Sequence, residues 1–155
     1  MNHNFRNALA FTLKWEGGLE GKSDDPTDRG GRTKAGITQI AFDSWLRSMN
    51  ATPGRDVWTI TPDEISAIYE ERYWLPCRCD QLPDKLDLCM FDAAVNHGVR
   101  KAVQFLQRSA GVVDDGDFGP PDDAGGRSRQ LSRPDAVPAH WLLYGAGEIL
   151  FGHRT

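Results

Sequence analysis

An apolar segment that runs into Trp15-Glu16-Gly17-Gly18 constrains the start of this chain most strongly. Residues 4–15 place large apolar side chains among alanines, which predicts a helix, and the two glycines after Glu16 predict its end. A carboxylate at such a boundary is held by the helix on one side and stays open to a ligand on the other. The neighbouring indole lowers the local dielectric, so we expect a raised carboxyl pKa, as a general acid requires.

The stretch after this helix, residues 17–38, is rich in Gly, Asp, Thr and Lys. This composition predicts a loop or a short hairpin rather than a helix. A long polar segment of this kind within a compact domain commonly has a function. Its aspartates have a second interpretation, because Asp25-Pro26 and the segment 28–31 are also typical of turns.

Four more helices are expected from apolar periodicity and from helix-end signals. The clearest start is Thr61-Pro62-Asp63-Glu64, with Thr61 as N-cap, proline at the first helical position and Glu64 completing a capping box. The expected helices span residues 39–48, 61–74, 84–97 and 100–110. The predicted fold class is therefore mainly α, with one short polar β-hairpin or loop after the first helix.

Composition excludes several classes of protein. A chain of 155 residues can form one domain with a real core, and its net charge of −4 argues against a nucleic-acid binder. No apolar run approaches the roughly 20 residues of a membrane span.

The N-terminus has no basic segment followed by an apolar one. We therefore expect that the chain has no signal peptide and is made in the cytoplasm. Five tryptophans suit flat, hydroxylated ligands such as sugars.

The three cysteines, Cys77, Cys79 and Cys89, are expected to be structural or incidental. Their number is odd, and the Cys77–Cys79 spacing does not match common zinc or redox pairs. A disulfide framework is not expected in a chain made in the cytoplasm.

Glu16, followed by a loop that carries carboxylates and hydroxyls, has the layout used in glycoside hydrolysis. One carboxylic acid protonates the leaving oxygen, while a second group orients water or stabilises an oxocarbenium-like transition state. This chemistry requires no metal and no other cofactor. The alternative is that Glu16 is a solvated charge at a helix end.

Several collinear segments carry a resemblance to one family, and they lie at residues 11–18, 25–38, 68–74, 91–98, 105–107 and 115–120. Together they resemble glycoside hydrolase family 108, the lysozyme-like N-acetylmuramidases of phage endolysins and of secretion activator proteins. Segments 11–18 and 25–38 are similar to the first part of that pattern, and 68–74 to its second signature. The later segments are similar to its C-terminal peptidoglycan-binding part.

The resemblance implies a lysozyme-like domain in which Glu16 is the general acid. The bond cleaved would be the β-1,4 linkage between N-acetylmuramic acid and N-acetylglucosamine. Asp25 and Thr33 are the candidates for positioning the water molecule. The stretch between Gly18 and Asp25 is longer than the usual pattern, which leaves the exact placement of Asp25 open.

Three further residues are candidates for binding the sugar. Tyr73 and Trp74 are expected to line the cleft, with core packing as the alternative for both. Asn96 follows an apolar helix face, where its side chain is expected to hydrogen-bond an acetamido group. The adjacent His97 is expected to be a helix-end or surface residue.

The expected organisation is a muramidase catalytic region at 1–88, a peptidoglycan-binding segment of the same compact domain at 89–120, and an atypical tail at 121–155. The expected partner is the peptidoglycan glycan strand, bound by a monomer, with no nucleic-acid partner. A prophage endolysin made in the cytoplasm would reach the cell wall through a holin or another signal-independent route. The alternative is a non-catalytic peptidoglycan-binding or secretion-assisting protein.

The tail from about Pro121 departs from the family pattern, and we predict that it is frameshifted. Reading back-translated codons one base out of phase yields residue patterns like the helices that the family has there. The predicted consequences are disorder in much of 121–155 and poor solubility or reduced activity, since each lost large apolar contact is worth roughly 1.5–3 kcal/mol. Sequencing the gene tests this, and the hypothesis is wrong if no single-base shift restores a helical pattern.

Overall fold

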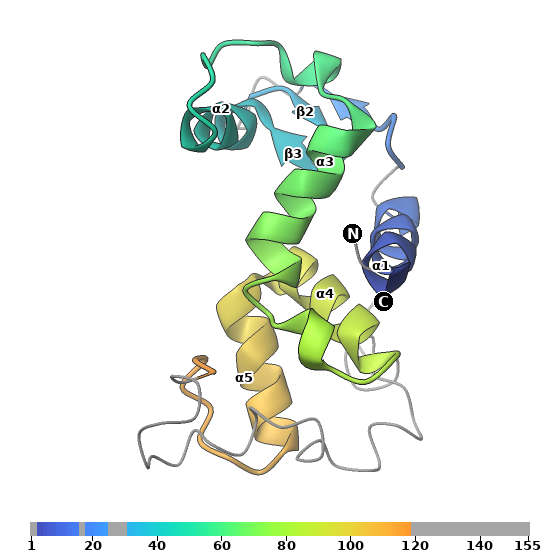
Figure 1. Cartoon of the computed structure of the whole chain (residues 1–155), viewed down its shortest axis with the longest axis vertical. Helices are drawn as coiled ribbons and strands as arrows, with labels where there is room; N and C mark the ends of the chain where they lie inside the picture. Colours follow the sequence, from blue (N-terminus) through green and yellow to red (C-terminus); the bar gives the residue numbers. More distant parts are fainter. Residues whose placement is uncertain (1–2, 16–17, 25–30, 119–155) are drawn as a thin grey trace. The chain divides into compact units, whose positions relative to one another are not determined.

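The computed structural model describes residues 3–15, 18–24 and 31–118 of the chain. Most of this part is helical, and it also contains a small three-stranded antiparallel sheet (Figure 1). The mainly α class with a short hairpin, as in a lysozyme-like fold, is therefore confirmed. Packing divides the described residues into a sheet unit, Leu9–Glu70, and a helical unit, 3–8 with 71–118. The tail, and with it the predicted frameshift and disorder, lies outside the described residues.

Each of the expected helices is present in the described part. The α-helices are α1 (His3–Trp15), α2 (Gln39–Ser48), α3 (Pro62–Tyr69), α4 (Leu86–His97) and α5 (Val99–Ser109). The strands are β1 (Lys22–Ser23), β2 (Thr33–Lys34) and β3 (Ile37–Thr38). The π-helical segment η2 (Glu70–Trp74) follows α3 directly and fills the rest of the predicted helix 61–74. The 3₁₀ segments η1 (Val57–Thr59) and η3 (Cys79–Gln81) were not predicted from the sequence.

The sheet of the sheet unit comes from the polar stretch 17–38. β1 pairs with β2 and β2 with β3, in the order β1-β2-β3. Lys34 pairs with Ile37, so only Ala35 and Gly36 connect β2 to β3. Both have positive φ, 49° and 74°, as a tight two-residue hairpin turn requires. The Ala-Gly dipeptide therefore sets the register of this hairpin.

Tyr69, the last residue of α3, holds this turn in place. Its hydroxyl donates a 2.9 Å hydrogen bond to the carbonyl of Ala35, which is fully buried. A Cβ atom on Gly36 would lie 2.7 Å from the same hydroxyl oxygen. Only glycine leaves room for that oxygen at this position. The buried apolar side chains around the turn and helices of this unit include Ile37, Phe42, Trp45, Leu46, Val57, Ile60, Ile65 and Ile68.

The capping box predicted at the start of α3 is present. The Thr61 hydroxyl accepts from the Glu64 amide at 3.3 Å, and Glu64 Oε2 accepts from the Thr61 amide at 2.9 Å. Partial burial works to raise the pKa of Glu64, but hydrogen bonds from Arg55 and Thr61 outweigh it and lower that pKa. The carboxylate that caps the helix therefore stays ionised to a lower pH than an exposed glutamate.

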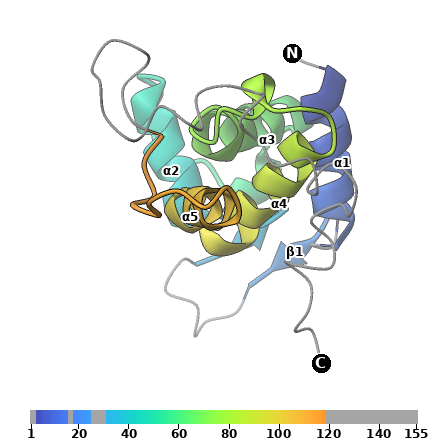
Figure 2. The ribbon, with the colours of Figure 1, turned by 90° about the horizontal axis from the view of Figure 1, so that it is seen from below.

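In the helical unit, α4 and α5 pack side by side (Figure 2). α4 begins at Leu86, two residues later than expected, because Lys85 has a φ of 76° that a right-handed helix does not allow. Asp84 instead accepts a 2.8 Å hydrogen bond from the Asn4 side chain. Gly98, with a φ of 86°, separates α4 from α5.

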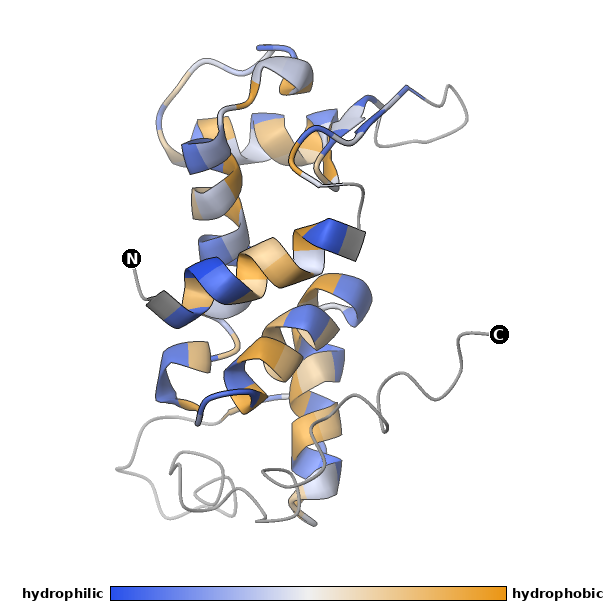
Figure 3. Cartoon of the chain, turned by 90° about the vertical axis from the view of Figure 1, so that its right-hand side faces the viewer, coloured by the Kyte–Doolittle hydropathy of each residue, from blue (hydrophilic) through white to orange (hydrophobic). Residues whose placement is uncertain are grey.

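The core of the helical unit contains three aromatic rings in edge-to-face contact. Phe5 lies 5.3 Å from Trp74 and 5.7 Å from Phe91, and Trp74 lies 5.7 Å from Phe91 between ring centroids. Phe5 comes from α1, whose apolar residues lie in its middle turns between more polar ends (Figure 3). Edge-to-face pairs of this kind add to the stability that burial provides.

Cys77 and Cys79 are buried in the same unit and Cys89 is half-buried, and these cysteines form no disulfide among the described residues. A hydrogen bond with Cys77, together with burial, raises the pKa of Cys79. Buried cysteine side chains such as these two act as small apolar groups. In the described residues, no helix combines the length and the apolar character needed to cross a bilayer.

We expect Gly36→Ala to destabilise the sheet unit more than a glycine replacement that meets only backbone strain. Gly111 is the matched control, because its φ is 68° and a Cβ there would have no neighbour within 4 Å. The free energy of unfolding in urea should fall by about 1–3 kcal/mol more for Gly36→Ala, since the new methyl group displaces the Tyr69 hydroxyl. Equal losses in the two variants would contradict the contact.

Candidate functional site

Glu16 directly follows the last residue of α1. Glu16 and Asp25 lie outside the described residues, so their side-chain roles remain predictions. The end of the helix beside Glu16 is described. The amide of Gly18, at a φ of 74°, donates a 2.7 Å hydrogen bond to the carbonyl of Leu13. This bond closes the helix as a glycine C-cap does, which confirms the predicted helix end.

Thr33 begins β2 and is half-buried. It pairs with Ser23 on β1 and with Thr38 on β3, so it occupies the central strand of the sheet. Its hydroxyl donates a long, 3.4 Å hydrogen bond to the carbonyl of Gly31. The sheet thus holds the Thr33 backbone on both edges, while the hydroxyl has only a weak partner.

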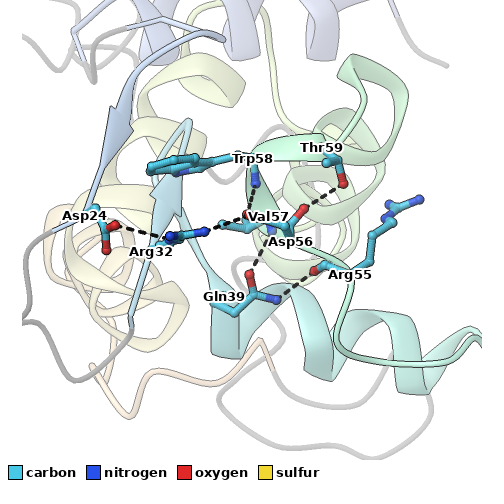
Figure 4. A network of polar contacts seen from close by, with 8 residues as sticks. All are labelled: Asp24, Arg32, Gln39, Arg55, Asp56, Val57, Trp58 and Thr59. Atoms are coloured by element: carbon cyan, nitrogen blue, oxygen red, sulfur yellow. Dashed lines mark hydrogen bonds and ion pairs between the residues drawn. The ribbon is translucent and has the colours of Figure 1, made fainter.

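Arg32 is the centre of a polar network beside Thr33 (Figure 4). Its Nε donates to Asp24 Oδ2 at 3.2 Å, and its Nη1 donates to Asp56 Oδ2 at 2.8 Å. The guanidinium carbon lies 4.5 Å from the centroid of the Trp58 ring. The hydrogen bond and charge of Asp24, followed by the charge of Asp56, raise the pKa of Arg32. The two carboxylates therefore favour the charged form of the guanidinium.

Asp56 also organises the η1 turn with its other oxygen. Oδ1 accepts from the Trp58 amide at 2.9 Å, and the Asp56 carbonyl accepts from the Thr59 hydroxyl at 2.7 Å. Gln39, at the start of α2, accepts from the Val57 amide and donates to the Arg55 carbonyl, both at 2.8 Å (Figure 4). The segment that carries Trp58 is therefore held from two sides.

Lys34 makes the second connection between β2 and η1. Its side chain is only 10% exposed, and Nζ donates to the carbonyls of Trp58 at 3.4 Å and Ile60 at 3.3 Å. The carboxylate of Glu20 lies 4.0 Å from the same nitrogen. A buried ammonium with these partners has a structural role, because it satisfies carbonyls that lie away from water.

Two cations lie near the Trp58 ring. Besides Arg32, the ammonium of Lys22 lies 5.7 Å from the ring centroid. Within the described residues, its indole N–H is buried and has no hydrogen-bond partner. Asp56 and Trp58 were not predicted from the sequence, because residues 49–60 have no periodic pattern. The available signal was an aspartate two residues before a tryptophan.

The predicted sugar-binding residues lie in the helical unit. Tyr73 and Trp74 belong to η2, where Tyr73 is half-buried and Trp74 is wholly buried. The Trp74 indole N–H donates to Asp80 at 2.7 Å, so this side chain has neither free surface nor a free donor. Trp74 is therefore a core residue, which was the alternative considered for it. The structure does not support the expectation that Trp74 lines the sugar cleft.

Asn96 lies in the last turn of α4 and is exposed. Its amide nitrogen donates a 2.8 Å hydrogen bond to the carbonyl of Asp92, one turn earlier. His97 is also exposed, and its ring lies edge-on to Phe105 at 5.7 Å. The described residues contain no group of three or more His, Cys, Asp or Glu side chains that could hold a metal ion.

The helices and the small polar sheet after the first helix are consistent with a lysozyme-like fold. The sequence profile of the family described as glycosyl hydrolase 108 matches residues 9–98, so the chain belongs to this family. The match supports a general role in peptidoglycan hydrolysis.

A solved structure described as Brucella abortus SagA is 28% identical to this chain. The alignment covers 96% of this chain and 84% of that one, with a TM-score of 0.59. No curated protein matches the chain. The family and the structural likeness agree with the resemblance inferred from the sequence motifs.

We expect Lys34→Met to lower the free energy of unfolding by about 1–3 kcal/mol, because the carbonyls of Trp58 and Ile60 lose their shared donor. Lys22→Met is the control, since it removes an exposed lysine from the neighbouring strand at a cost of about 0.5 kcal/mol or less. Urea unfolding followed by circular dichroism measures both values. If the two variants unfold alike, Lys34 does not hold β2 to η1.

Proposed function

We propose that this chain is an N-acetylmuramidase that cleaves the β-1,4 bond between N-acetylmuramic acid and N-acetylglucosamine, with Glu16 as the general acid. The observation that carries the proposal is the family match over 9–98, which includes Glu16. The end of α1 at Trp15 and the hydrogen bond from Gly18 to Leu13 agree with it, because Glu16 directly follows the end of this helix in the sequence.

In the proposed reaction, the Glu16 carboxylic acid gives its proton to the glycosidic oxygen as the bond to the anomeric carbon breaks. Positive charge develops on the sugar ring, and a water molecule adds to the anomeric carbon and loses a proton. Asp25 and Thr33 are proposed to position that water. The place of Thr33 on the central strand suits this role, because pairing on both sides restrains its backbone.

Tyr73 and Asn96 are proposed to contact the sugar. An exposed amide such as that of Asn96 has the donor and acceptor that an acetamido group requires. Tyr73 is half-buried and carries both an apolar ring and a hydroxyl, which suits a sugar face.

The proposed substrate is the peptidoglycan glycan strand, and the proposed context is lysis by a prophage endolysin. We propose that the protein acts as a monomer, is made in the cytoplasm, and reaches the cell wall through a holin or another signal-independent route. Residues 1–88 are the proposed catalytic region, and 89–120 the proposed peptidoglycan-binding segment.

We expect Glu16→Gln to abolish glycan cleavage and to leave peptidoglycan binding intact. Loss of the general acid should lower the rate by about 10²–10⁴-fold, because the leaving oxygen receives no proton. The measurement is the release of reducing ends from purified peptidoglycan, together with a sedimentation assay for binding.

Glu20→Gln is the matched control, since it makes the same chemical change at an exposed glutamate of the same segment. It should retain activity. Undiminished lysis by Glu16→Gln would refute the assignment of Glu16. Binding without any cleavage by the unaltered protein would favour a non-catalytic peptidoglycan-binding or secretion-assisting protein.

A further inference from the structure

Lys22 differs from the other two cations near Trp58. Arg32 and Lys34 each have at least one carboxylate partner. The ammonium of Lys22 lies 5.7 Å from the centroid of the Trp58 ring, and within the described residues no carboxylate pairs with it. Lys22 is exposed, so its charge is available to a ligand.

Stability does not explain the position of Lys22 in the sheet. Lys22 lies directly opposite Lys34 on the neighbouring strand, and like charges at opposite positions of an antiparallel pair are destabilising. The contact between the exposed ammonium and the Trp58 ring is weak at this distance. Binding of an anion explains the position better, because two adjacent cations attract a negative charge.

The place of Lys22 at the edge of the sheet makes it accessible to such a ligand. The strand order is β1-β2-β3, so β1 has one neighbouring strand in the described part of the chain. Both residues of β1 are exposed. A ligand can therefore approach Lys22 without displacing another strand of this sheet.

Trp58 adds an apolar surface beside this charge. Its side chain is half-buried, and its amide donates a 2.9 Å hydrogen bond to Asp56 Oδ1. Its carbonyl accepts from Lys34 Nζ at 3.4 Å, so the backbone that carries the indole is held on both sides. An indole ring suits the face of a sugar or a methyl group, and an ammonium suits a carboxylate. Lys22 and Trp58 together fit a ligand that carries both groups.

Within the proposed substrate, the muramyl unit has this combination, whereas N-acetylglucosamine is uncharged. The lactyl group of the muramyl unit ends either in a carboxylate or in an amide to a stem peptide that has carboxylates of its own. We propose that Lys22 and Trp58 form a subsite for a carboxylate-bearing muramyl unit. The ammonium pairs with the carboxylate, and the indole ring covers an apolar face of the sugar or the lactyl methyl group. This inference rests on the proposed function, which supplies the substrate.

The test measures the binding of three small ligands by NMR titration. The first is a disaccharide of N-acetylglucosamine and N-acetylmuramic acid, with the muramic acid at its reducing end and a stem peptide attached. The second is the same disaccharide without the peptide, and the third is the neutral dimer of N-acetylglucosamine. The bond proposed for cleavage is absent from all three ligands, so binding is measured without turnover.

Lys22→Met should weaken the binding of a carboxylate-bearing ligand about three- to fivefold and leave that of the neutral dimer unchanged. Arg47→Met is the matched control, because it removes a positive charge from an exposed side chain of α2 in the same unit. It should change each affinity by less than about 1.5-fold. Lys22→Arg keeps the charge and should also bind within about 1.5-fold of the unaltered protein.

Lys22→Glu separates binding from folding. It places a carboxylate opposite Lys34, so the melting temperature should not fall. The carboxylate-bearing ligand should nevertheless bind about fivefold or more weakly, because like charges now meet.

A loss of affinity in Lys22→Met for the peptide-bearing disaccharide alone would support the subsite and identify the stem peptide as the source of the carboxylate. A loss for the peptide-free disaccharide, alone or as well, would support it with the lactyl carboxylate as a ligand. Equal losses for all three ligands, no loss in Lys22→Met, or no binding by the unaltered protein would overturn the subsite.

Release of reducing ends from purified peptidoglycan tests the proposed function separately. Lys22-dependent binding in a protein that releases no reducing ends would support the subsite and refute the proposed cleavage. Cleavage by a protein whose Lys22→Met variant binds every ligand normally would refute the subsite alone.

Discussion

The sheet unit depends on the contact between the Tyr69 hydroxyl and the turn at Ala35 and Gly36. Strands of two residues have too few hydrogen bonds to be stable alone, so they need support from outside the sheet. Tyr69 provides it from the end of α3, where its hydroxyl satisfies a buried carbonyl and occupies the space that Gly36 leaves empty. The position of β2, and with it Thr33, follows from this contact.

Two cations next to Thr33 then attach the sheet to η1 in different ways. Lys34 is buried and satisfies carbonyl oxygens, so its role is to stabilise the packing. Arg32 is exposed, and it pairs with Asp24 and Asp56 and lies over the Trp58 ring. A short sheet with little core of its own thus gains rigidity from charged groups placed on both sides of one threonine.

The family match and the fold agree on a glycoside hydrolase, and the described residues show how the region around its proposed site is built. α1 ends in a glycine cap, and the strands that follow are held by a tyrosine, a lysine and an arginine. Of the residues proposed for the reaction, Thr33 lies in the central strand of this sheet.

Local patterns in the sequence determined the helices, because periodicity, Thr61 with Glu64, and the stops at Gly18 and Gly98 act within a few residues. They also determined that 17–38 is a hairpin region. Only the tertiary structure decided that Trp74 is a core residue, that α4 starts after Lys85, and that Arg32 meets Asp56 and Trp58. These outcomes depend on groups that are far apart in the chain. A local sequence pattern does not indicate which distant residues will contact a buried ring or an exposed guanidinium.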